Sequence, residues 1–378
     1  MKKFLALTLA LVMSLSLVAC GDKKTDDTKT DAPDQTEQPA ENEGAYKVAM
    51  ITDYGDITDQ SFNQTTYEAC KAFAEDNSIE FSYFRPAGDN TADRVAMIEK
   101  AVDEGFNVIV MPGYAFGGAI VEAAPEFPDV KFIALDVAAG DLLETAVAKA
   151  GEAYDYTPEN WDLNKYVDMS NVYCAVYQEE LCGYMAGYAA VKLGYKNLGF
   201  LGGMSVPAVV RYGYGFVQGV DAAAADLGLT DVKLNYIYGG QFFGDADITA
   251  VMDTWYQGGT EVVFACGGGI YTSAVDAAKK VGAKVIGVDV DQAGVIANYA
   301  GVDGMTVTSA MKGLYPATYD TLTDVIVNGN WEKYVGKIET LGLVSGTDPE
   351  ANYVQIPMGD GTQWSDSFTQ DDYKAMVK

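Results

Sequence analysis

A nearly unbroken alternation of strand-like and helix-like segments from residue 46 onward constrains the fold of this chain more than any other feature. Short apolar runs with β-branched members predict buried strands. The strand candidates are Tyr46–Thr52, Glu80–Arg85, Asn107–Met111, Lys131–Asp136, Asn171–Tyr177, Asn197–Leu201, Val232–Tyr238, Glu261–Cys266 and Lys284–Asp289. The helical candidates between them include Thr91–Glu104, Glu179–Leu193, Arg211–Leu227, Asp245–Tyr256 and Thr272–Val281. This alternation is typical of βαβ units, and the strands outnumber those of one typical sheet, so we predict an α/β fold with two parallel sheets.

Many of the predicted strands end in an aspartate or a glycine. These residues are Asp53, Gly113, Asp136, Gly202, Gly203, Gly267–Gly269 and Asp289. Ligands of open parallel sheets bind outside the carboxyl ends of the strands, and glycine there lets the backbone approach a ligand closely. Because the pattern repeats at strand after strand, we expect two lobes whose polar strand ends face one another across a cleft.

The stretch Val48–Glu68 contains the first of these units in full: an apolar run, an acidic loop, and a helical pattern that begins at Ser61. The loop carries three carboxylates at i, i+3 and i+6, a spacing that does not fit the alternating ligands of an EF-hand; they are Asp53, Asp56 and Asp59. We interpret these carboxylates as residues that shape the loop, which forms one wall of the cleft.

The first twenty residues have the features of a targeting segment. Lys2 and Lys3 precede the apolar stretch Phe4–Val18, which is too short for a typical spanning helix. The segment ends in LVAC, which resembles a bacterial lipobox, so we predict a lipoprotein signal peptide at 1–20 and a lipid on Cys20. Residues 21–45 contain no aromatic or large aliphatic residue and are expected to be a disordered acidic stalk. The protein is thus expected at the cell membrane, lipid-anchored and facing outside the cytoplasm.

Charge and the absence of histidine exclude several classes of function. The formal charge of −29 disfavours nucleic acid and anionic membrane surfaces as partners of the folded part. Without histidine the chain cannot assemble a Ser-His-Asp or Cys-His group. We therefore expect no enzymatic activity, no cofactor and no metal site. The cysteines beyond the lipobox are expected to be buried free thiols: Cys70, Cys174, Cys182 and Cys266.

Five sequence blocks, in order along the chain, resemble the basic membrane protein family, which comprises bacterial substrate-binding lipoproteins of ABC transporters and includes purine nucleoside receptors. The blocks are DYGDITDQSFNQ (Asp53–Gln64), FIALD ending at Asp136, VFACGGG, VIGVDVDQ and TSAMKG, and the resemblance covers roughly 46–327. It implies a type I periplasmic-binding-protein fold, in which two Rossmann-like lobes with parallel sheets are joined by a three-segment hinge. Lobe one would comprise 46–178 plus 292–335, and lobe two 179–291 plus 336–378. The crossings would lie near Tyr177–Glu180, Asp291–Gln292 and Trp331–Lys337.

The resemblance also implies a nucleoside ligand, with a purine as the expected base, and a role for each matching residue. Asn63 and Asp136 would read the base, and Asp289 would accept from the ribose hydroxyls. Phe216 would stack on the base from one side, with Tyr67 or Phe62 on the other. The further expected contacts are Lys312 near the sugar, Gly267 in the glycine run, and Asp59, although the family often has adjacent acidic residues where this chain has Thr58-Asp59. The implied partner is an ABC permease, and we expect a monomer.

Three other interpretations remain open from the sequence. A sugar or another small polar solute would also use carboxylates and aromatic rings in the same fold. A nucleoside hydrolase-like enzyme is suggested by the three aspartates of the first loop, but its leaving base would lack a histidine donor. A surface adhesin would leave the polar strand ends unexplained.

Overall fold

The computed structural model describes residues 45–378 of the chain. The predicted signal peptide, Cys20 and all but the last residue of the predicted stalk lie outside the described residues. Within residues 45–378, no helix is both long and apolar enough to cross a membrane.

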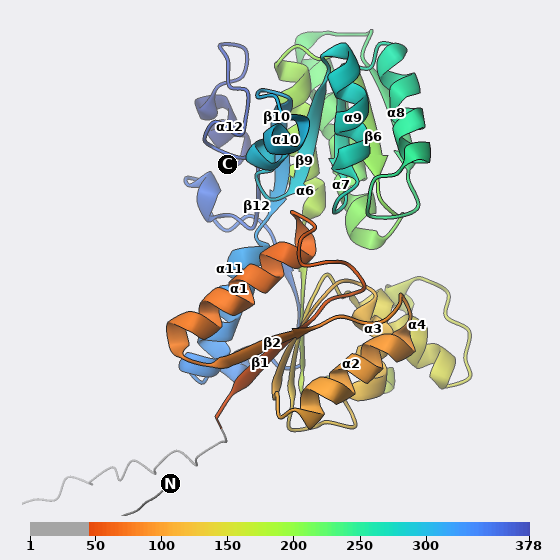
Figure 1. Ribbon diagram of the computed structural model, residues 1–378, viewed down its shortest axis with the longest axis vertical. Helices are drawn as coiled ribbons and strands as arrows, with labels where there is room; N and C mark the ends of the chain where they lie inside the picture. Colours follow the sequence, from red (N-terminus) through yellow and green to blue (C-terminus); the bar gives the residue numbers. More distant parts are fainter. Residues whose placement is uncertain (1–44) are drawn as a thin grey trace, which may run out of the picture. The chain divides into compact units, whose positions relative to one another are not determined.

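The described chain contains two six-stranded sheets, which confirms the predicted α/β fold with two sheets (Figure 1). The first sheet has the order β11-β5-β4-β3-β1-β2, and all its pairs are parallel. Its strands are β1 (Lys47–Ile51), β2 (Glu80–Phe84), β3 (Val108–Pro112), β4 (Lys131–Leu135), β5 (Val172–Tyr177) and β11 (Ile338–Leu341). The second sheet has the order β12-β10-β9-β8-β6-β7, in which only the short β12 is antiparallel. Its strands are β6 (Asn197–Gly202), β7 (Lys233–Tyr238), β8 (Val262–Cys266), β9 (Lys284–Asp289), β10 (Thr306–Lys312) and β12 (Val354–Gln355).

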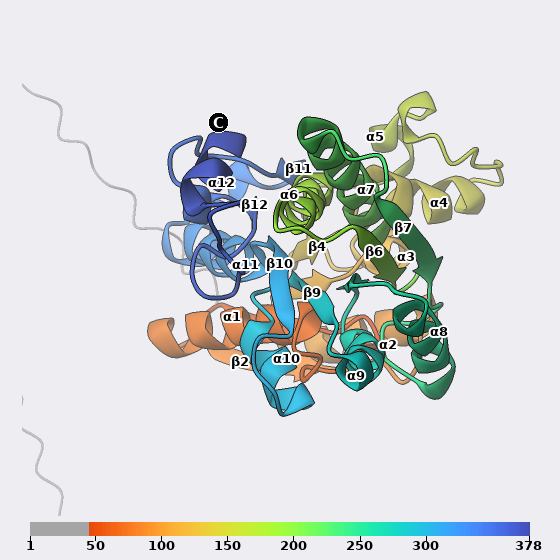
Figure 2. The ribbon, with the colours of Figure 1, turned by 90° about the horizontal axis from the view of Figure 1, so that it is seen from above.

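Helices cover both faces of each sheet. The first sheet lies between α1 and α11 on one face and α2, α3 and α4 on the other, and Figure 2 shows α1 beside α11. The helices are α1 (Phe62–Asn77), α2 (Thr91–Asp103), α3 (Phe116–Ala123), α4 (Ala139–Lys149), α5 (Leu163–Tyr166), α6 (Glu179–Lys192), α7 (Pro207–Leu227), α8 (Ala246–Gln257), α9 (Tyr271–Val281), α10 (Ala293–Ala300), α11 (Leu314–Leu322) and α12 (Gln370–Met376). Side chains of β1 alternate between the two layers, because Val48 and Met50 pack into one core and Ala49 and Ile51 into the other. This two-sided burial explains why the strands appear in the sequence as continuous apolar runs.

The α6–α7 pair is the tightest helix contact of the second lobe. A Cβ added to Gly183 would lie 2.3 Å from the Tyr212 carbonyl oxygen, and one added to Gly215 would lie 1.9 Å from the Glu180 carbonyl oxygen. Glycines therefore allow the two backbones to approach closely. The first residue of α6 and the first turns of α7 are thereby held at fixed positions beside the cleft.

The chain crosses between the lobes three times, but two of the crossings differ from the predicted ones. The first falls between β5 and α6, near Tyr177–Glu180. Beyond Asp291–Gln292, however, β10 pairs with β9, so the chain stays in the second lobe until Gly313 and only then forms α11 against α1. The predicted return near Trp331–Lys337 is also wrong, because β11 pairs with β5 in the first sheet. The assignment of 292–335 to lobe one and 336–378 to lobe two is therefore wrong. The segment through β10 belongs to lobe two, α11 and β11 belong to lobe one, and the third crossing lies between β11 and β12.

The chain stays in the second lobe beyond Gln292 because β10 is buried. Six of its seven residues are buried, and a strand buried on both faces needs neighbours in the middle of a sheet. It finds them in β9 and β12. Its last residue, Lys312, consequently lies at the carboxyl edge of the second sheet, one residue before the chain crosses.

Candidate ligand-binding cleft

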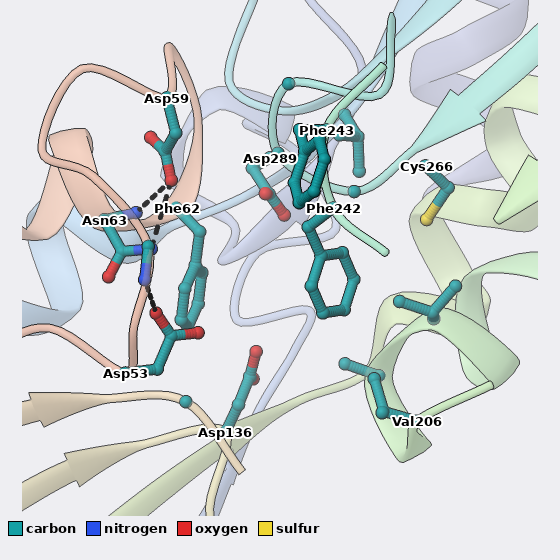
Figure 3. Close-up of a pocket in the computed structure, with 18 of the residues that line it drawn as sticks. Asp53, Asp59, Phe62, Asn63, Asp136, Val206, Phe242, Phe243, Cys266 and Asp289 are labelled. Carbon is teal, nitrogen blue, oxygen red and sulfur yellow. Dashed lines mark hydrogen bonds between the residues drawn. The ribbon is translucent and has the colours of Figure 1, made fainter. Parts of the chain in front are cut away.

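A cavity of about 350 Å³ lies between the carboxyl ends of the two sheets (Figure 3). The first lobe contributes the loop between β1 and α1, the turn after β3, and Asp136 after β4. The second lobe contributes the start of α7, the loop after β7, the glycine run after β8, and the ends of β9 and β10. A cavity of this size and position is typical of a small-molecule site. The predicted site residues that line it are Asp59, Phe62, Asn63, Asp136, Gly267, Asp289 and Lys312.

Asp59 organises the beginning of α1. Its carboxylate accepts backbone hydrogen bonds from Ser61 (3.0 Å), Asn63 (2.9 Å) and Gln64 (3.1 Å), and one from the Asn63 amide (3.2 Å). These donors include amides that a helix N-terminus leaves without intrahelical partners. Burial raises the pKa of Asp59 to about 6, against the opposing effect of these hydrogen bonds. Asp59 therefore lines the cavity with its oxygens already engaged by the loop.

The other two carboxylates of this loop are engaged in the same way. Asp53 accepts hydrogen bonds at 2.7 Å from the backbone amides of Tyr54 and Gly55, and burial raises its pKa. Asp56 accepts from Thr58 and pairs with Arg85 at 2.8 Å. The three aspartates thus shape the loop, as the sequence indicated.

Asn63 is held by the loop through its amide nitrogen. The side chain forms hydrogen bonds with the carboxylates of both Asp53 and Asp59, while the Asn63 Oδ1 atom is buried without a hydrogen-bond partner among the described residues. A buried acceptor without a partner is costly, and Asn63 is 5% exposed at the wall of the cavity. An N–H donor of a ligand could satisfy it.

Lys312 is the centre of a buried polar cluster that joins the lobes. Its ammonium pairs with Asp136 of the first lobe, with Glu179 at 3.4 Å, and with Asp289 at 3.8 Å. Burial by itself would lower the pKa of Lys312, but the three carboxylates more than offset this, so the net shift is upward. The ammonium also lies 4.7 Å from the centroid of the Phe62 ring. Lys312 is therefore a permanent positive charge at one end of the cavity.

Asp136 and Asp289 occupy equivalent places in the two lobes. Asp136 follows β4 with a φ of 60°, and Asp289 ends β9 with a φ of 66°. Both values lie in the left-handed region, which aspartate tolerates better than most residues and which is common at functional sites. The sharp turn brings both carboxylates to the same ammonium.

Asp136 and Asp289 differ in whether a carboxylate oxygen is left free to accept a hydrogen bond. Asp289 accepts from the Ser61 hydroxyl (2.5 Å) and the Tyr212 hydroxyl (3.1 Å), so both its oxygens are engaged. Asp136 bonds Lys312 through Oδ2, but its Oδ1 is buried and has no hydrogen-bond partner within the part of the chain that the structure describes. The open carboxylate oxygen beside Lys312 thus belongs to Asp136, which the sequence assigned to the base, rather than to Asp289, which it assigned to the ribose.

Phenylalanines of both lobes line the cavity: Phe62 of the first lobe, and Phe242 and Phe243 of the second. Figure 3 shows Phe62, at the start of α1, and Phe242, in the loop after β7, on opposite sides of it. Phe242 rests on glycine: a Cβ on Gly203 would lie 2.3 Å from its ring, and one on Gly267 would lie 2.7 Å from it. Gly267 also has a φ of 137°. The glycine run therefore makes room for an aromatic side chain, in addition to any approach of its backbone to a ligand.

Two of the predicted aromatic contacts are wrong. Phe216 is fully buried in the core of the second lobe, where its ring centroid lies 5.3 Å from that of Phe264. Tyr67 packs on the outer side of the first lobe against Phe81 and Tyr83, with ring centroids 5.7 Å and 5.4 Å away. Both residues face away because helical periodicity places them off the cleft side of their helices. Of the alternatives Tyr67 and Phe62, only Phe62 lies at the cavity.

Sequence reasoning missed Phe242, Glu179 and Tyr212. The signal for Phe242 was present, because the adjacent Phe242 and Phe243 stand in a polar, glycine-containing loop directly after a strand, where no core is available. Glu179 and Tyr212 gave no such signal, since their place beside Lys312 depends on how α6 and α7 pack.

The four cysteines of the described chain, Cys70, Cys174, Cys182 and Cys266, are buried and free, which confirms the prediction. Burial raises the pKa of each thiol. Cys266 lines the cavity at the end of β8. These thiols are therefore small apolar packing groups and not reactive ones.

Two α/β lobes, three chain crossings and a cavity lined by the strand ends of both define a two-lobed solute-binding protein. A crystal structure of an ABC transporter system solute-binding protein from Aeropyrum pernix K1 has the same fold, with a TM-score of 0.65, 20% identity, and coverage of 88% of this chain and 85% of that chain. Residues 46–347 match the family model Bmp, described as ABC transporter substrate-binding protein PnrA-like, and the chain belongs to this family. It is therefore the substrate-binding component of an ABC transporter, with a type I periplasmic-binding-protein fold, and not an enzyme.

The chain is also similar to relatives from several organisms. The ABC transporter nucleoside-binding protein BmpA of Lactococcus lactis subsp. cremoris is 25% identical over 77% of this chain and 75% of its own length. Basic membrane protein B of Borreliella burgdorferi is 26% identical over 82% of this chain and 83% of its own length. A lipoprotein of Pyrococcus abyssi is 25% identical over 90% of this chain and 74% of its own length.

Proposed function

We propose that this protein captures a nucleoside in the cavity between its lobes and delivers it to an ABC permease. The observation that carries the proposal is that the cavity combines two kinds of surface. The rings of Phe62 and Phe242 face it from opposite sides (Figure 3), and Asn63, Lys312 and Asp136, with its open oxygen, supply polar groups along its wall. A nucleoside likewise combines a flat, apolar-faced base with a hydroxylated sugar.

The base would lie between Phe62 and Phe242. Aromatic faces bury a base whatever its substituents, and stacking contributes about 1–3 kcal/mol per base. The unpartnered Asn63 Oδ1 would accept from an N–H group on the edge of the base. Purines and pyrimidines both offer such donors, and a purine is the expected base from the resemblance to the family.

The ribose would lie against Lys312 and Asp136. A carboxylate oxygen accepts hydroxyl protons through strong, charge-assisted hydrogen bonds. Asp136 supplies a free oxygen of this kind, Oδ1, while Lys312 holds the carboxylate in place through Oδ2. Asp289, whose oxygens are engaged by Ser61 and Tyr212, would contribute mainly by orienting Lys312 and closing the lobes.

The mature protein would act as a monomer tethered by a lipid on Cys20. The name of the Pyrococcus abyssi relative as a lipoprotein supports this anchoring, as does the lipobox-like sequence. The stalk after Cys20 would allow the lobes to reach the permease at the membrane. The Lactococcus lactis relative is described as a nucleoside-binding protein, which supports the choice of a nucleoside as the cargo.

Calorimetric titration of the chain without residues 1–20 against a ligand panel tests the proposal. The panel contains inosine, guanosine, adenosine, uridine, the free bases and ribose. We expect nucleosides to bind more tightly than either the corresponding base or ribose alone, because only they fill both parts of the cavity. Binding of ribose or another sugar without any response to a nucleoside would contradict the proposal and favour a sugar-binding function.

A further inference from the structure

Glu179 is a fully buried carboxylate beside the cavity that does not line it. It is the first residue of α6 and stands directly after the first crossing between the lobes. Lys312 stands directly before the second crossing, at the end of β10. Glu179 and Lys312 therefore flank two of the three chain segments that must bend when the lobes move.

Glu179 connects Lys312 to the body of the second lobe. Its Oε1 atom lies 3.4 Å from the Lys312 ammonium, and its Oε2 atom accepts a hydrogen bond from Arg211 Nε at 2.6 Å. Arg211 is on α7, which packs tightly against α6. The position of the ammonium is thus set from the first lobe by Asp136 and from the second by Glu179.

We propose that Glu179 is a positioning residue that holds the Lys312 ammonium, together with Asp136, at the place where the sugar of the ligand binds. A flexible lysine side chain defines a site only when its neighbours fix the ammonium, and supporting hydrogen bonds do this for functional groups in general. This inference rests on the proposed function, because it assigns Lys312 and Asp136 to the sugar end of a nucleoside.

Burial of an ionised carboxylate is costly, and the pKa of Glu179 shows that its neighbours do not fully offset this cost. Burial raises its pKa, Lys312 lowers it, Asp136 raises it and Arg211 lowers it, with a net value of about 7. The charged groups around it are thus Lys312 on β10, Asp136 after β4 and Arg211 on α7, and Asp289 at the end of β9 acts through Lys312. Other titratable groups that interact with it are Tyr177 on β5, Cys182 on α6, Tyr212 on α7 and Cys266 on β8. Below pH 7, Glu179 takes up a proton and loses its charge, and Lys312 loses one of the groups that hold it. The neutral amide in Glu179→Gln has nearly the same shape and reproduces that protonated state.

The test compares Glu179→Gln with the unchanged protein in calorimetric titrations with inosine and with hypoxanthine, its free base, at pH 8. We expect the affinity for inosine to fall about tenfold, the effect of losing one charge-assisted contact, and that for hypoxanthine to stay the same. Glu180→Gln is the matched control, because it removes the same charge one residue along α6 from a side chain that forms no ion pair with Lys312 among the described residues. The control should bind both ligands as the unchanged protein does.

Two further measurements separate positioning from a structural role. Affinity for inosine should fall as the pH is lowered from 8 to 6 in the unchanged protein, and this step near pH 7 should be absent in Glu179→Gln. In a Lys312→Met background, Glu179→Gln should have no further effect on inosine affinity, because the residue it positions is gone.

The measurements distinguish failure of the positioning role from failure of the proposed function and from a folding defect. Equal loss of inosine and hypoxanthine binding in Glu179→Gln, or the same pH step in both proteins, would overturn the positioning role. If the unchanged protein binds no nucleoside at all, the proposed function fails before Glu179 is tested. A folding defect would appear as a lower melting temperature, whereas we expect Glu179→Gln to be at least as stable at pH 8, because the neutral form is the one that burial favours.

Discussion

Lys312 and Asp136 form a buried ion pair between the lobes, and the pair leaves one oxygen of Asp136 without a partner among residues 45–378. Lys312 belongs to the second sheet and Asp136 to the first, so the contact exists only when the lobes are close together. The same holds for the Ser61 hydroxyl on Asp289 and for the Gln292 amide on the Gln60 carbonyl (3.0 Å). Closure therefore creates the polar end of the cavity and does not merely cover it.

Asp136→Asn should weaken nucleosides by at least about tenfold and leave free bases nearly unaffected. The substitution replaces a charged acceptor, which forms the stronger hydrogen bonds, by a neutral amide, and it removes the direct counter-charge of Lys312. Calorimetry with inosine and hypoxanthine measures both effects. An equal loss for the two ligands would place Asp136 at the base instead, as the sequence first suggested.

Phe242→Ala should weaken nucleosides and free bases alike, by about 1–3 kcal/mol, because it removes one of the stacking faces. The neighbouring Phe243 offers a matched comparison, since it also lines the cavity but is 56% exposed as a residue. Phe243→Ala should change the affinity much less. If Phe243→Ala has the larger effect, the ring that covers the base is Phe243.

Phe216→Ala should destabilise the fold by about 3–5 kcal/mol, because it opens a hole in a close-packed core. The ring fills the space between α6, α7 and Phe264. Denaturant unfolding measures this loss, and calorimetry on the folded protein should give an unchanged preference between nucleosides. A stable variant that loses all base stacking would restore the stacking role predicted from the sequence.

The protein should be more stable at pH 5 than at pH 7.5. Burial raises the pKa values of Asp59 and Asp141 to about 6, and that of Glu179 to about 7, above the ordinary values of 3.8 and 4.5. A carboxyl group with a raised pKa in the folded state contributes stability that is full below its ordinary pKa and is lost as the pH rises through the folded value. Thermal unfolding between pH 4.5 and 8 checks this. A melting temperature that is constant or rises across this range would contradict these shifts.

Cys20→Ser should release the protein from the membrane. A cysteine at the end of a lipobox-like sequence is the attachment point for lipid, and acyl chains supply the binding energy at about 0.8 kcal/mol per buried CH₂. Fractionation of producing cells into membrane and soluble material measures the change. Retention of Cys20→Ser at the membrane would contradict lipid anchoring through this residue.

The sequence predicted the fold well because the central strands of a sheet covered on both sides are apolar on both faces, as in Val48–Ile51 and Val262–Cys266. The strand-end pattern placed Asp136, Gly267 and Asp289 at the cavity, whereas Phe62, Asn63 and Lys312 were expected there from the resemblance to the family. Sequence reasoning failed for Phe216 and Tyr67, since one turn of a helix decides whether a ring faces the cleft or the core. It also misplaced two crossings, because the position of β10 is fixed by pairing with β9 across the sheet, which no local pattern records.

A crystal structure of the protein grown with inosine tests the proposed binding mode most directly. We expect the base between Phe62 and Phe242 and a ribose hydroxyl within hydrogen-bonding distance of Asp136 Oδ1. A ligand bound in the reverse orientation, with its base at Lys312, or density for inosine only outside the cavity, would contradict this binding mode.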